Sequence, residues 1–503
     1  MFQVLGGYMK AAWPAIVTLL VMSSSGCIGF PTLFEQRVAV APAALPAAPL
    51  PARSVSSNPT QRLLNLDQCI EVSRRNNPSL AAGAWDIQTA LAQRDVAASE
   101  RWPQISTNDS YRNYVQTQRL QPARINAEPG MFSTSILAMD LVLKMPLFTG
   151  GRVRSEISAA EFLTLAAENR LARTWEELIF NISSAFYTIL GQHRLIESLQ
   201  FSLEVLTKHK RRVLDMMAAN KAARVDVLRT EVRIADVEQR LVREETVLEI
   251  QHRLLTTLMG ITTEGMPVKV QGDLRLTGSS PNLNGALSMA YSERGDYRAA
   301  RASLDAQVMK INSARAAKWP KVSLDGSYGL RVAGGIDDDG VAYTKRLNWP
   351  NYQTPLDPDK APLRGPWPNP DSNLPVGQIG VALDYPIFDG GRISSQVQEQ
   401  ESKLVAAQQL LRKLELQIRL DVETALLNIS SARRRAEATQ KAIEQSKESY
   451  RIEQEKYDLG KGSITDVLDA QSAMLDAQTN YYKALSEYNI ALAQLVLATG
   501  EKR

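Results

Sequence analysis

The sequence contains the same pattern twice, and this repetition limits the folds that the chain can adopt. PLFTGGRV at 146–153 recurs as PIFDGGRI at 386–393, an offset of 240 residues. ERWPQIS at 100–106 recurs as AKWPKVS at 317–323, an offset of 217 residues. A repeat of this length indicates two copies of one structural unit. The offset differs between the two landmarks, so the second copy carries an insertion between them. The insertion lies in segment 333–375, whose many Gly, Asp, Asn and Pro residues are typical of an exposed loop.

Each copy orders its elements in the same way. A helix runs to the Trp-Pro pair, and a strand, a loop and a second strand follow. A Gly-Gly turn then opens a very long helix, which a short break separates from another long helix. We therefore expect a first structural repeat at 61–260, a linker at 261–282 and a second structural repeat at 283–500.

The strand candidates alternate apolar and polar residues with period two. In one of them Leu141 and Leu143 lie on one face, and Asp140 and Lys144 lie on the other. An apolar face opposite a charged face over roughly ten residues is typical of a strand in an outer-membrane β-barrel, and a half-buried sheet of a soluble domain is the alternative. In the weakest candidate Asp109 interrupts the apolar face. The four candidates lie near 104–116, 135–147, 322–332 and 378–387.

Four strands are too few to close a barrel. The smallest bacterial barrels have about eight strands. An open sheet edge is not tolerated in lipid, because its N–H and C=O groups would have no hydrogen-bond partners. We therefore expect several copies of the chain to share one barrel.

Two segments are long and free of proline. The first runs from Arg152 to about Val213 and contains one glycine, Gly191, whereas the second runs from Arg392 to about Glu455 and contains none. As a continuous helix each would extend roughly 90 Å, at 1.5 Å per residue. Helices of this length favour a coiled-coil-like assembly over a compact globule.

The last helical segment has the period of a coiled coil. Its seam positions are spaced alternately by four and three residues, which predicts left-handed helix pairing. Most of these positions are apolar, and the polar ones predict a partly hydrated seam. They are Ile464, Leu468, Gln471, Leu475, Gln478, Tyr482, Leu485, Asn489, Leu492 and Val496.

The amino terminus carries an export signal. Lys10 precedes an apolar run at 11–22, which is shorter than the ~20 residues that span a bilayer. Small residues follow the run, as in a secretory signal peptide, here 1–26. Cys27 resembles the acylated cysteine of a bacterial lipoprotein, and ordinary cleavage nearby is the alternative. The Pro- and Ala-rich segment 27–60 is expected to be a tether.

Composition argues against nucleic-acid binding and catalysis. The net charge of +4 is spread along the chain without a basic block. The sequence contains no phosphate-binding loop, no Ser-His-Asp motif and no Cys/His metal spacing. We expect no enzyme activity, no cofactor and no metal site. His193 and His209 lie on one long helical segment and are expected to be solvated or seam residues.

Several of these motifs together resemble the TolC family of outer-membrane channel proteins, from about Leu66 to Gly500. They are NNPSL at 76–80, the paired Trp-Pro and Gly-Gly-Arg landmarks, and YDLGKGSITDVLDAQ at 457–471. The resemblance implies an α+β membrane protein, a homotrimer whose protomers each give four strands to one shared twelve-stranded β-barrel. Long antiparallel coiled-coil-like helices would form a periplasmic tunnel. It also implies a cell outer membrane location with a periplasmic extension, contact with outer-membrane lipid, and docking to a periplasmic adaptor protein and an inner-membrane transporter.

The resemblance places the periplasmic entrance at the turns near 213–226 and 453–466. Family members carry two aspartates just past the second turn, and the matching residues are Asp466 and Asp469. Rings of aspartate at a constriction attract cations and repel anions. For Asp466 the alternative is a helix capping box with Ser463.

The same resemblance gives roles to residues within the turns. Tyr457 matches a family tyrosine near a basic residue that ties the entrance shut, and packing in the helix seam is its alternative. Here glycine occupies the basic position, so the closing contact is not evident. Both turns are expected to contact the adaptor, through Asn220, Lys221, Gly460, Lys461 and Gly462.

Three functional hypotheses follow from the sequence. The first is a passive outer-membrane exit duct of a tripartite efflux pump that carries small molecules. The second is the same duct serving a type I protein secretion system. The third belongs to another class, a secreted coiled-coil scaffold without a pore.

Overall fold

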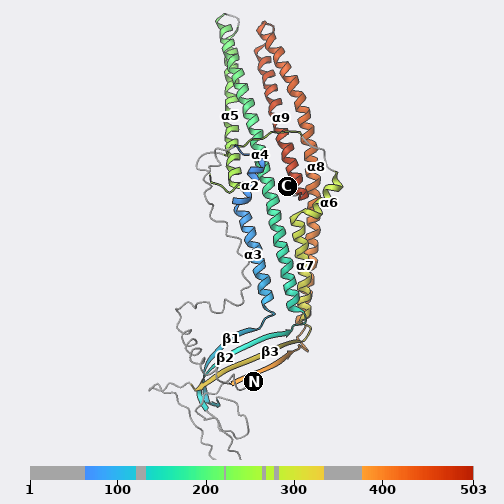
Figure 1. Ribbon diagram of the computed structural model, residues 1–503. Coiled ribbons are helices and arrows are strands. Elements are labelled where there is room, and N and C mark those ends of the chain that lie inside the picture. Colours follow the sequence, from blue (N-terminus) through green and yellow to red (C-terminus); the bar gives the residue numbers. More distant parts are fainter. Residues whose placement is uncertain are drawn as a thin grey trace, which may run out of the picture. The chain divides into compact units, whose positions relative to one another are not determined.

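The computed structural model describes residues 63–119, 132–219, 222–262, 268–276, 282–333 and 376–501, all within one compact unit, Asn58–Arg503. The expected signal peptide, the tether, Cys27, Asn220, Lys221 and most of the 333–375 loop lie outside these residues. The described helices are α2 (Leu66–Asn76), α3 (Pro78–Ser99), α4 (Arg152–Ala218), α5 (Arg224–Leu258), α6 (Leu283–Glu293), α7 (Gly295–Ala316), α8 (Arg392–Asp458) and α9 (Ile464–Thr499) (Figure 1). The described strands are β1 (Gln104–Arg119), β2 (Phe132–Phe148), β3 (Lys321–Ala333) and β4 (Val376–Asp384).

The four strands form one antiparallel sheet in the order β1-β2-β3-β4, which leaves β1 and β4 at its edges. Residues that pair directly across strands share a face of the sheet. Leu143 pairs with Ile105 and with Gly326, and Gly326 pairs with Ile379. The apolar faces of all four strands therefore form one continuous face. Its exposed side chains include Ile105, Tyr111, Val115, Leu141, Tyr328, Ile379, Val381 and Leu383.

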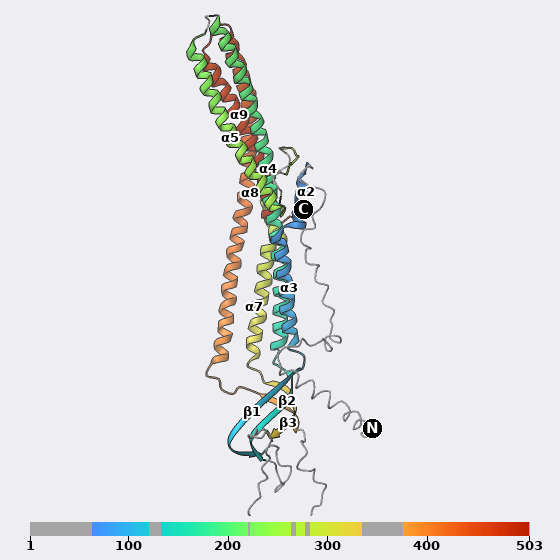
Figure 2. The same cartoon turned by 90° about the vertical axis from the view of Figure 1, so that its left-hand side faces the viewer.

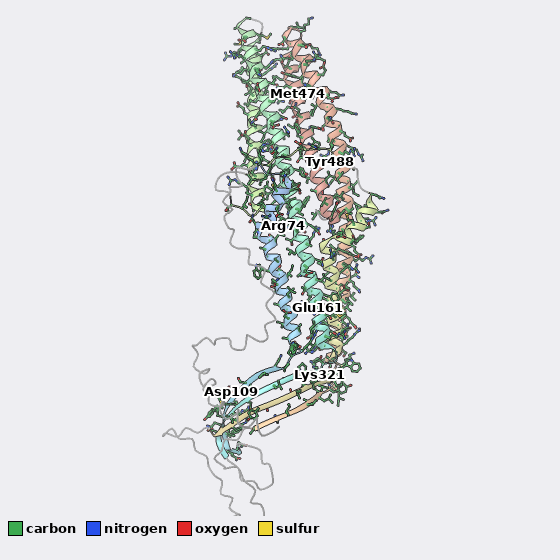
Figure 3. The ribbon with its side chains drawn as sticks, viewed as in Figure 1. Arg74, Asp109, Glu161, Lys321, Met474 and Tyr488 are labelled. Carbon is green, nitrogen blue, oxygen red and sulfur yellow. The ribbon has the colours of Figure 1, made fainter. Side chains whose placement is uncertain are left out.

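The opposite face of the sheet is charged. The Arg331 guanidinium donates to the Asp140 carboxylate at 2.6 Å, and Lys144 pairs across strands with Asp325. Asp109 of β1, labelled in Figure 3, is the exception, because its pairing with Met139 places it on the apolar face. Alternation in the sequence therefore assigns the faces correctly, including the interruption at position 109.

Pro146 and Pro386 occupy equivalent positions in the two repeats, but the strands beside them end at different points. β2 continues past Pro146 through an irregularity between Pro146 and Phe148. β4 ends at Asp384, before Pro386, so the expected extension of this strand to residue 387 is absent.

Helices α4 and α8 each have 67 residues and extend about 100 Å. Each begins directly after a glycine pair whose backbone angles φ are positive: 62° and 88° at Gly150 and Gly151, and 67° and 86° at Gly390 and Gly391. Positive φ values are readily adopted only by glycine. The Gly-Gly landmark of the repeat is therefore one turn conformation that occurs twice.

The long helices pack in antiparallel pairs. Figures 1 and 2 both show α5 beside α4, and Figure 1 shows α9 beside α8, with which it is in contact. Near the turns that end these pairs, one hydrophobic cluster includes Leu206 of α4, Val237 of α5, Tyr457 of α8 and Leu468 of α9. A second cluster, which includes Tyr488 of α9, joins that helix to α6 and α8 (Figure 3).

The polar seam positions of α9 are drier than the sequence suggests. Gln471 is only 3% exposed, and its Nε2 donates to the carbonyl and the Oγ of Ser202 on α4 at 3.2 and 3.1 Å. Asn489 is buried as well, and its Nδ2 donates to the Leu485 carbonyl at 2.8 Å. The expectation of a partly hydrated seam is therefore wrong at these two positions, because protein groups satisfy the amides.

The two repeats close their helix junctions in the same way. Between α2 and α3, the Asn77 Nδ2 donates to the Leu258 carbonyl at 2.8 Å. Between α6 and α7, the Arg294 Nη1 donates to the Ala498 carbonyl at 3.5 Å. Leu258 and Ala498 are equivalent at the 240-residue offset, so each junction side chain caps the carboxyl end of the last long helix of its own repeat.

Residues 268–270 of the expected linker pack on the core of the first repeat. Leu64 forms a parallel bridge with Val270, and both belong to the cluster that contains Cys69. Burial raises the pKa of the Cys69 thiol to about 12, so this cysteine is an inert core residue. No helix in the described ranges is both long and apolar enough to cross a membrane.

Candidate functional site: the turns between the long helices

The α4–α5 and α8–α9 turns lie at the same end of the helices. The Arg212 guanidinium at the end of α4 forms an ion pair with Asp458 at the end of α8, at 2.9 Å. Just past the turns, the Arg229 Nη1 of α5 donates to the Thr465 Oγ1 of α9 at 3.0 Å. These contacts join the two repeats at the end where the TolC resemblance places the entrance.

The second turn has the geometry of a Schellman motif. Gly460 has a φ of 70°, and its N–H donates to the Tyr457 carbonyl at 2.9 Å. The Lys461 N–H donates to the Lys456 carbonyl at 2.8 Å. This pair of bonds closes the end of α8 and requires a left-handed residue, which glycine supplies.

Gly462 lies against the end of α8. A Cβ atom there would come within 3.0 Å of the Lys456 Cβ and 3.1 Å of the Tyr457 backbone nitrogen. A side chain at this position would require the end of α8 to shift. Close packing against α8 thus explains why position 462 is a glycine, where the TolC resemblance implies a basic residue. The side chain of the adjacent Lys461 is exposed.

Asp466 and Asp469 are both exposed in the first turns of α9. The Asp466 carboxylate accepts the Ser463 N–H at 3.3 Å, and the Ser463 Oγ accepts the Thr465 N–H at 3.1 Å, which is the capping arrangement that the Ser-x-x-Asp spacing predicts. Asp469 has no hydrogen bond or ion pair with any residue in the described ranges. Their three-residue spacing places both carboxylates on one side of the helix.

Tyr457 and His209 form a buried polar pair behind the turn. Each is 6% exposed, and their ring centroids lie 5.5 Å apart. Neither the Tyr457 hydroxyl nor either His209 nitrogen has a hydrogen-bond partner among the described residues. Burial, together with the charge of Arg212, holds the pKa of His209 below its ordinary value, with Asp458 opposing the shift. Burial also raises the pKa of Tyr457, with contributions from Asp226 and Asp458.

Both turns share one acidic position. The Asp226 carboxylate accepts the Ala223 N–H at 3.3 Å and so caps α5 as Asp466 caps α9. Three residues later the first turn carries Arg229 instead of a second aspartate. The remaining predicted contact residues of this turn, Asn220 and Lys221, lie outside the described residues.

Arginines of α5 connect it to α9 along the turn end. Beyond Arg229, the Arg233 side chain donates to the Ser472 hydroxyl, and Arg240 lies 3.5 Å from the Asp476 carboxylate. The sequence gives no signal for these contacts, because they depend on how two separate helix pairs are placed. The structure shows no group of three potential metal ligands within its described ranges.

A protein-family model described as "Outer membrane efflux protein" matches residues 69–261 and 370–501, which is more than half of the chain. The chain belongs to this family. The efflux protein is therefore an outer-membrane channel protein and not an enzyme, as the sequence motifs predict.

Two curated relatives and one solved structure agree with this assignment. The efflux protein is 25% identical over 445 residues to outer membrane protein OprJ of Pseudomonas aeruginosa, covering 86% of this chain and 84% of OprJ. It is 22% identical over 412 residues to outer membrane protein TolC of Salmonella enteritidis, covering 82% of this chain and 76% of that TolC. The outer-membrane channel OprN has the same fold, with a TM-score of 0.69 at 20% identity over 87% of this chain and 90% of OprN.

Two histidines of the efflux protein, His209 and His252, are buried with pKa values lowered by burial, and His209 should contribute to a pH dependence of its stability. Because the pKa of His209 is lowered in the fold, the unfolded chain binds a proton below about pH 6.5 that the folded chain resists. Stability should therefore fall as the pH falls from 7 to 5, and His209→Phe should reduce this fall. Thermal unfolding followed by circular dichroism would measure it.

Lys208→Ala is the matched control, because Lys208 is the exposed neighbour of His209. It should keep the pH dependence of the wild type between these pH values. An unchanged pH dependence in His209→Phe would contradict the assignment of a desolvated histidine behind the turn.

Proposed function

We propose that the chain is one protomer of a homotrimeric, passive exit duct of a tripartite efflux pump, which carries small molecules across the outer membrane. The observation that carries the proposal is the open sheet. It has one continuous apolar face and one charged face, and no other described strand pairs with its edges at β1 and β4. Such a sheet suits lipid on one side and a water-filled lumen on the other, provided that other copies pair with its edges.

The amino terminus would serve export and anchoring. Residues 1–26 would be removed as a signal peptide, and 27–60 would tether the mature chain to the membrane. Cys27 would be acylated, and intact-mass measurement of the mature amino terminus would detect the lipid.

The turn end would form the periplasmic entrance and the docking surface. Asp466 and Asp469 of three chains would form two acidic rings there, and Tyr457 would support the entrance from behind. The glycine-rich second turn and the first turn would contact a periplasmic adaptor. An inner-membrane transporter would supply the energy, because the chain has no nucleotide-binding motif.

The cargo class distinguishes the two duct hypotheses. Deleting the gene from its native host should raise the accumulation of small fluorescent dyes in the cells and leave the secreted proteins unchanged. The family description names efflux, which favours this outcome. Normal dye efflux together with the loss of a secreted protein would instead assign the duct to type I secretion.

A further inference from the structure

We infer that Arg229 of α5 determines the charge preference of the entrance, because it places a positive charge beside the acidic residues Asp466 and Asp469 of α9. The entrance then admits small molecules with a carboxylate or phosphate group in addition to cationic ones. The inference rests on the proposed function, because it takes the turn end as the entrance of the duct. It goes beyond that function by naming the residue that sets which charges the entrance favours.

The two repeats differ at one charged position just past their turns. Asp226 and Asp466 are equivalent at the 240-residue offset, and each caps the helix that follows its turn. Three residues later, the second repeat carries Asp469 and the first repeat carries Arg229. Each chain therefore brings three aspartates and one arginine to these equivalent positions. The arginine opposes the charge of the aspartates where an exact repeat would have added to it.

The Arg229 side chain reaches across to the helix that carries the aspartates. Its Nη1 donates to the Thr465 Oγ1 at 3.0 Å, and it has no ion pair with a carboxylate among the described residues. Thr465 precedes Asp469 by four residues, so these two side chains are neighbours on one face of α9. The Arg229 guanidinium thus lies about one helical turn from the Asp469 carboxylate, which has no ion pair of its own in the described ranges.

This contact belongs to a register that holds over several helical turns. Arg240 lies 3.5 Å from the Asp476 carboxylate, and this pair has the same offset of 236 residues as the contact of Arg229. α5 and α9 therefore run side by side, both starting at the turns (Figure 1). Between these contacts, the Arg233 side chain donates to the Ser472 hydroxyl. α5 thus carries its arginines along the face of α9 that holds Asp469.

Both sides of the contact differ between the repeats. The α9 residues that accept hydrogen bonds from the arginines are Thr465 and Ser472, whereas their equivalents on α5 are Val225 and Val232. The α9 positions equivalent to the three arginines carry no arginine. A positive charge at this end is therefore supplied from α5 to α9 and not in the reverse direction.

The guanidinium acts on ions in the entrance through its charge. Arginine stays protonated in proteins, and the hydroxyl of Thr465 is neutral, so their contact leaves the positive charge uncancelled. A unit charge about 8 Å from a passing ion in water changes the occupancy of that ion about twofold, in opposite directions for cations and anions. We expect Arg229 to lower the ratio of cation to anion permeability about fourfold.

Reversal potentials of the full-length protein in planar bilayers test this expectation, in a gradient near 0.1 M salt, where charges are screened over about 10 Å. Arg229→Gln removes the charge and keeps a hydrogen-bond donor, so it should raise the permeability ratio about fourfold. Arg229→Asp, which copies Asp469, should raise the ratio further. Arg229→Lys keeps the charge and should leave the ratio close to that of the wild type.

Arg253→Gln is the matched control. Arg253 is an exposed arginine of the same helix, 24 residues further from the turn, which is roughly 36 Å along α5. Its replacement changes the net charge of the chain by the same amount and should leave the permeability ratio unchanged, because the distance exceeds the screening length.

Salt separates the effect of charge from a structural effect of the contact with Thr465. At about 1 M salt the screening length falls to about 3 Å, so the difference between Arg229→Gln and the wild type should shrink. A difference that keeps its size at this salt concentration would show that the substitution acts through the packing of α5 on α9, and would overturn the inference.

Failure of this inference is distinguishable from failure of the proposed duct. A conducting channel with the same permeability ratio in Arg229→Gln and the wild type would overturn the inference and leave the duct intact. A wild-type protein that conducts no ions would overturn both. A ratio that rises from the wild type to Arg229→Gln to Arg229→Asp, with Arg229→Lys and Arg253→Gln unchanged, supports the inference.

Discussion

Replacing Arg294 with methionine is expected to lower the free energy of unfolding by about 3 kcal/mol, at the lower end of the range for breaking a buried ion pair. Arg294 is only 2% exposed, and its guanidinium contacts Asp296 at 2.7 Å and Asp421 at 2.9 Å. Both aspartates retain some solvent contact, which moderates the cost of leaving them unpaired. Loss of the guanidinium also uncaps the Ala498 carbonyl at the end of α9.

Arg298→Met is the control for this prediction. Arg298 lies in the first turn of α7, four residues after Arg294, and is exposed, so its replacement should change stability by no more than about 0.5 kcal/mol. Chemical denaturation followed by circular dichroism would compare the two variants. Equal stability of Arg294→Met and Arg298→Met would show that the junction between α6 and α7 does not depend on its buried arginine.

The double substitution Asp466→Asn with Asp469→Asn should reduce the preference of the channel for cations over anions. A carboxylate about 4 Å from a passing monovalent cation lowers the energy of that cation by ~1 kcal/mol even in water. This energy corresponds to about a fivefold change in how often a cation occupies the position. Several such charges at one constriction would have a larger combined effect. The shift of the reversal potential across a salt gradient would measure the preference.

Asn retains a side-chain oxygen that can still cap α9, so the substitution should leave the fold intact. Asp476→Asn is the matched control, because Asp476 is exposed further along α9 and lies beside Arg240. It should leave selectivity close to that of the wild type. An unchanged reversal potential in the double variant would remove Asp466 and Asp469 from the lumen.

The elements could be predicted from the sequence because their signals are local. Alternation over residues 135–147 reflects a strand with two different faces, and the structure places Leu141 and Asp140 on opposite sides. The proline-free segment from Arg152 predicts a helix, and the structure extends it to Ala218, where the turn begins. Signals of this kind depend on neighbours within a few residues.

Contacts between distant segments could not be predicted in the same way. The ion pair of Arg212 with Asp458 and the contact of Arg229 with Thr465 depend on the placement of two helix pairs against each other. No local sequence pattern predicts the burial of Arg294 at the junction between α6 and α7. Its distant partner Ala498 is nevertheless the repeat equivalent of Leu258, which Asn77 contacts in the first repeat.

The burial of His209 in the helix seam could have been predicted from the sequence. The buried residues Leu199, Ser202, Leu206, His209 and Val213 follow the alternating spacing of three and four residues that marks a helix seam. This spacing places His209 on the buried face, beside Tyr457. The sequence leaves solvated and seam positions open for His209, and the structure selects the seam.

The most direct test of the central claim is single-channel recording of the purified full-length protein in a planar lipid bilayer. An outer-membrane duct predicts stepwise ion conductance that needs no added energy source, from protein that requires detergent for its extraction. A pore-less coiled-coil scaffold predicts no conductance and full solubility without detergent, and that result would contradict the account.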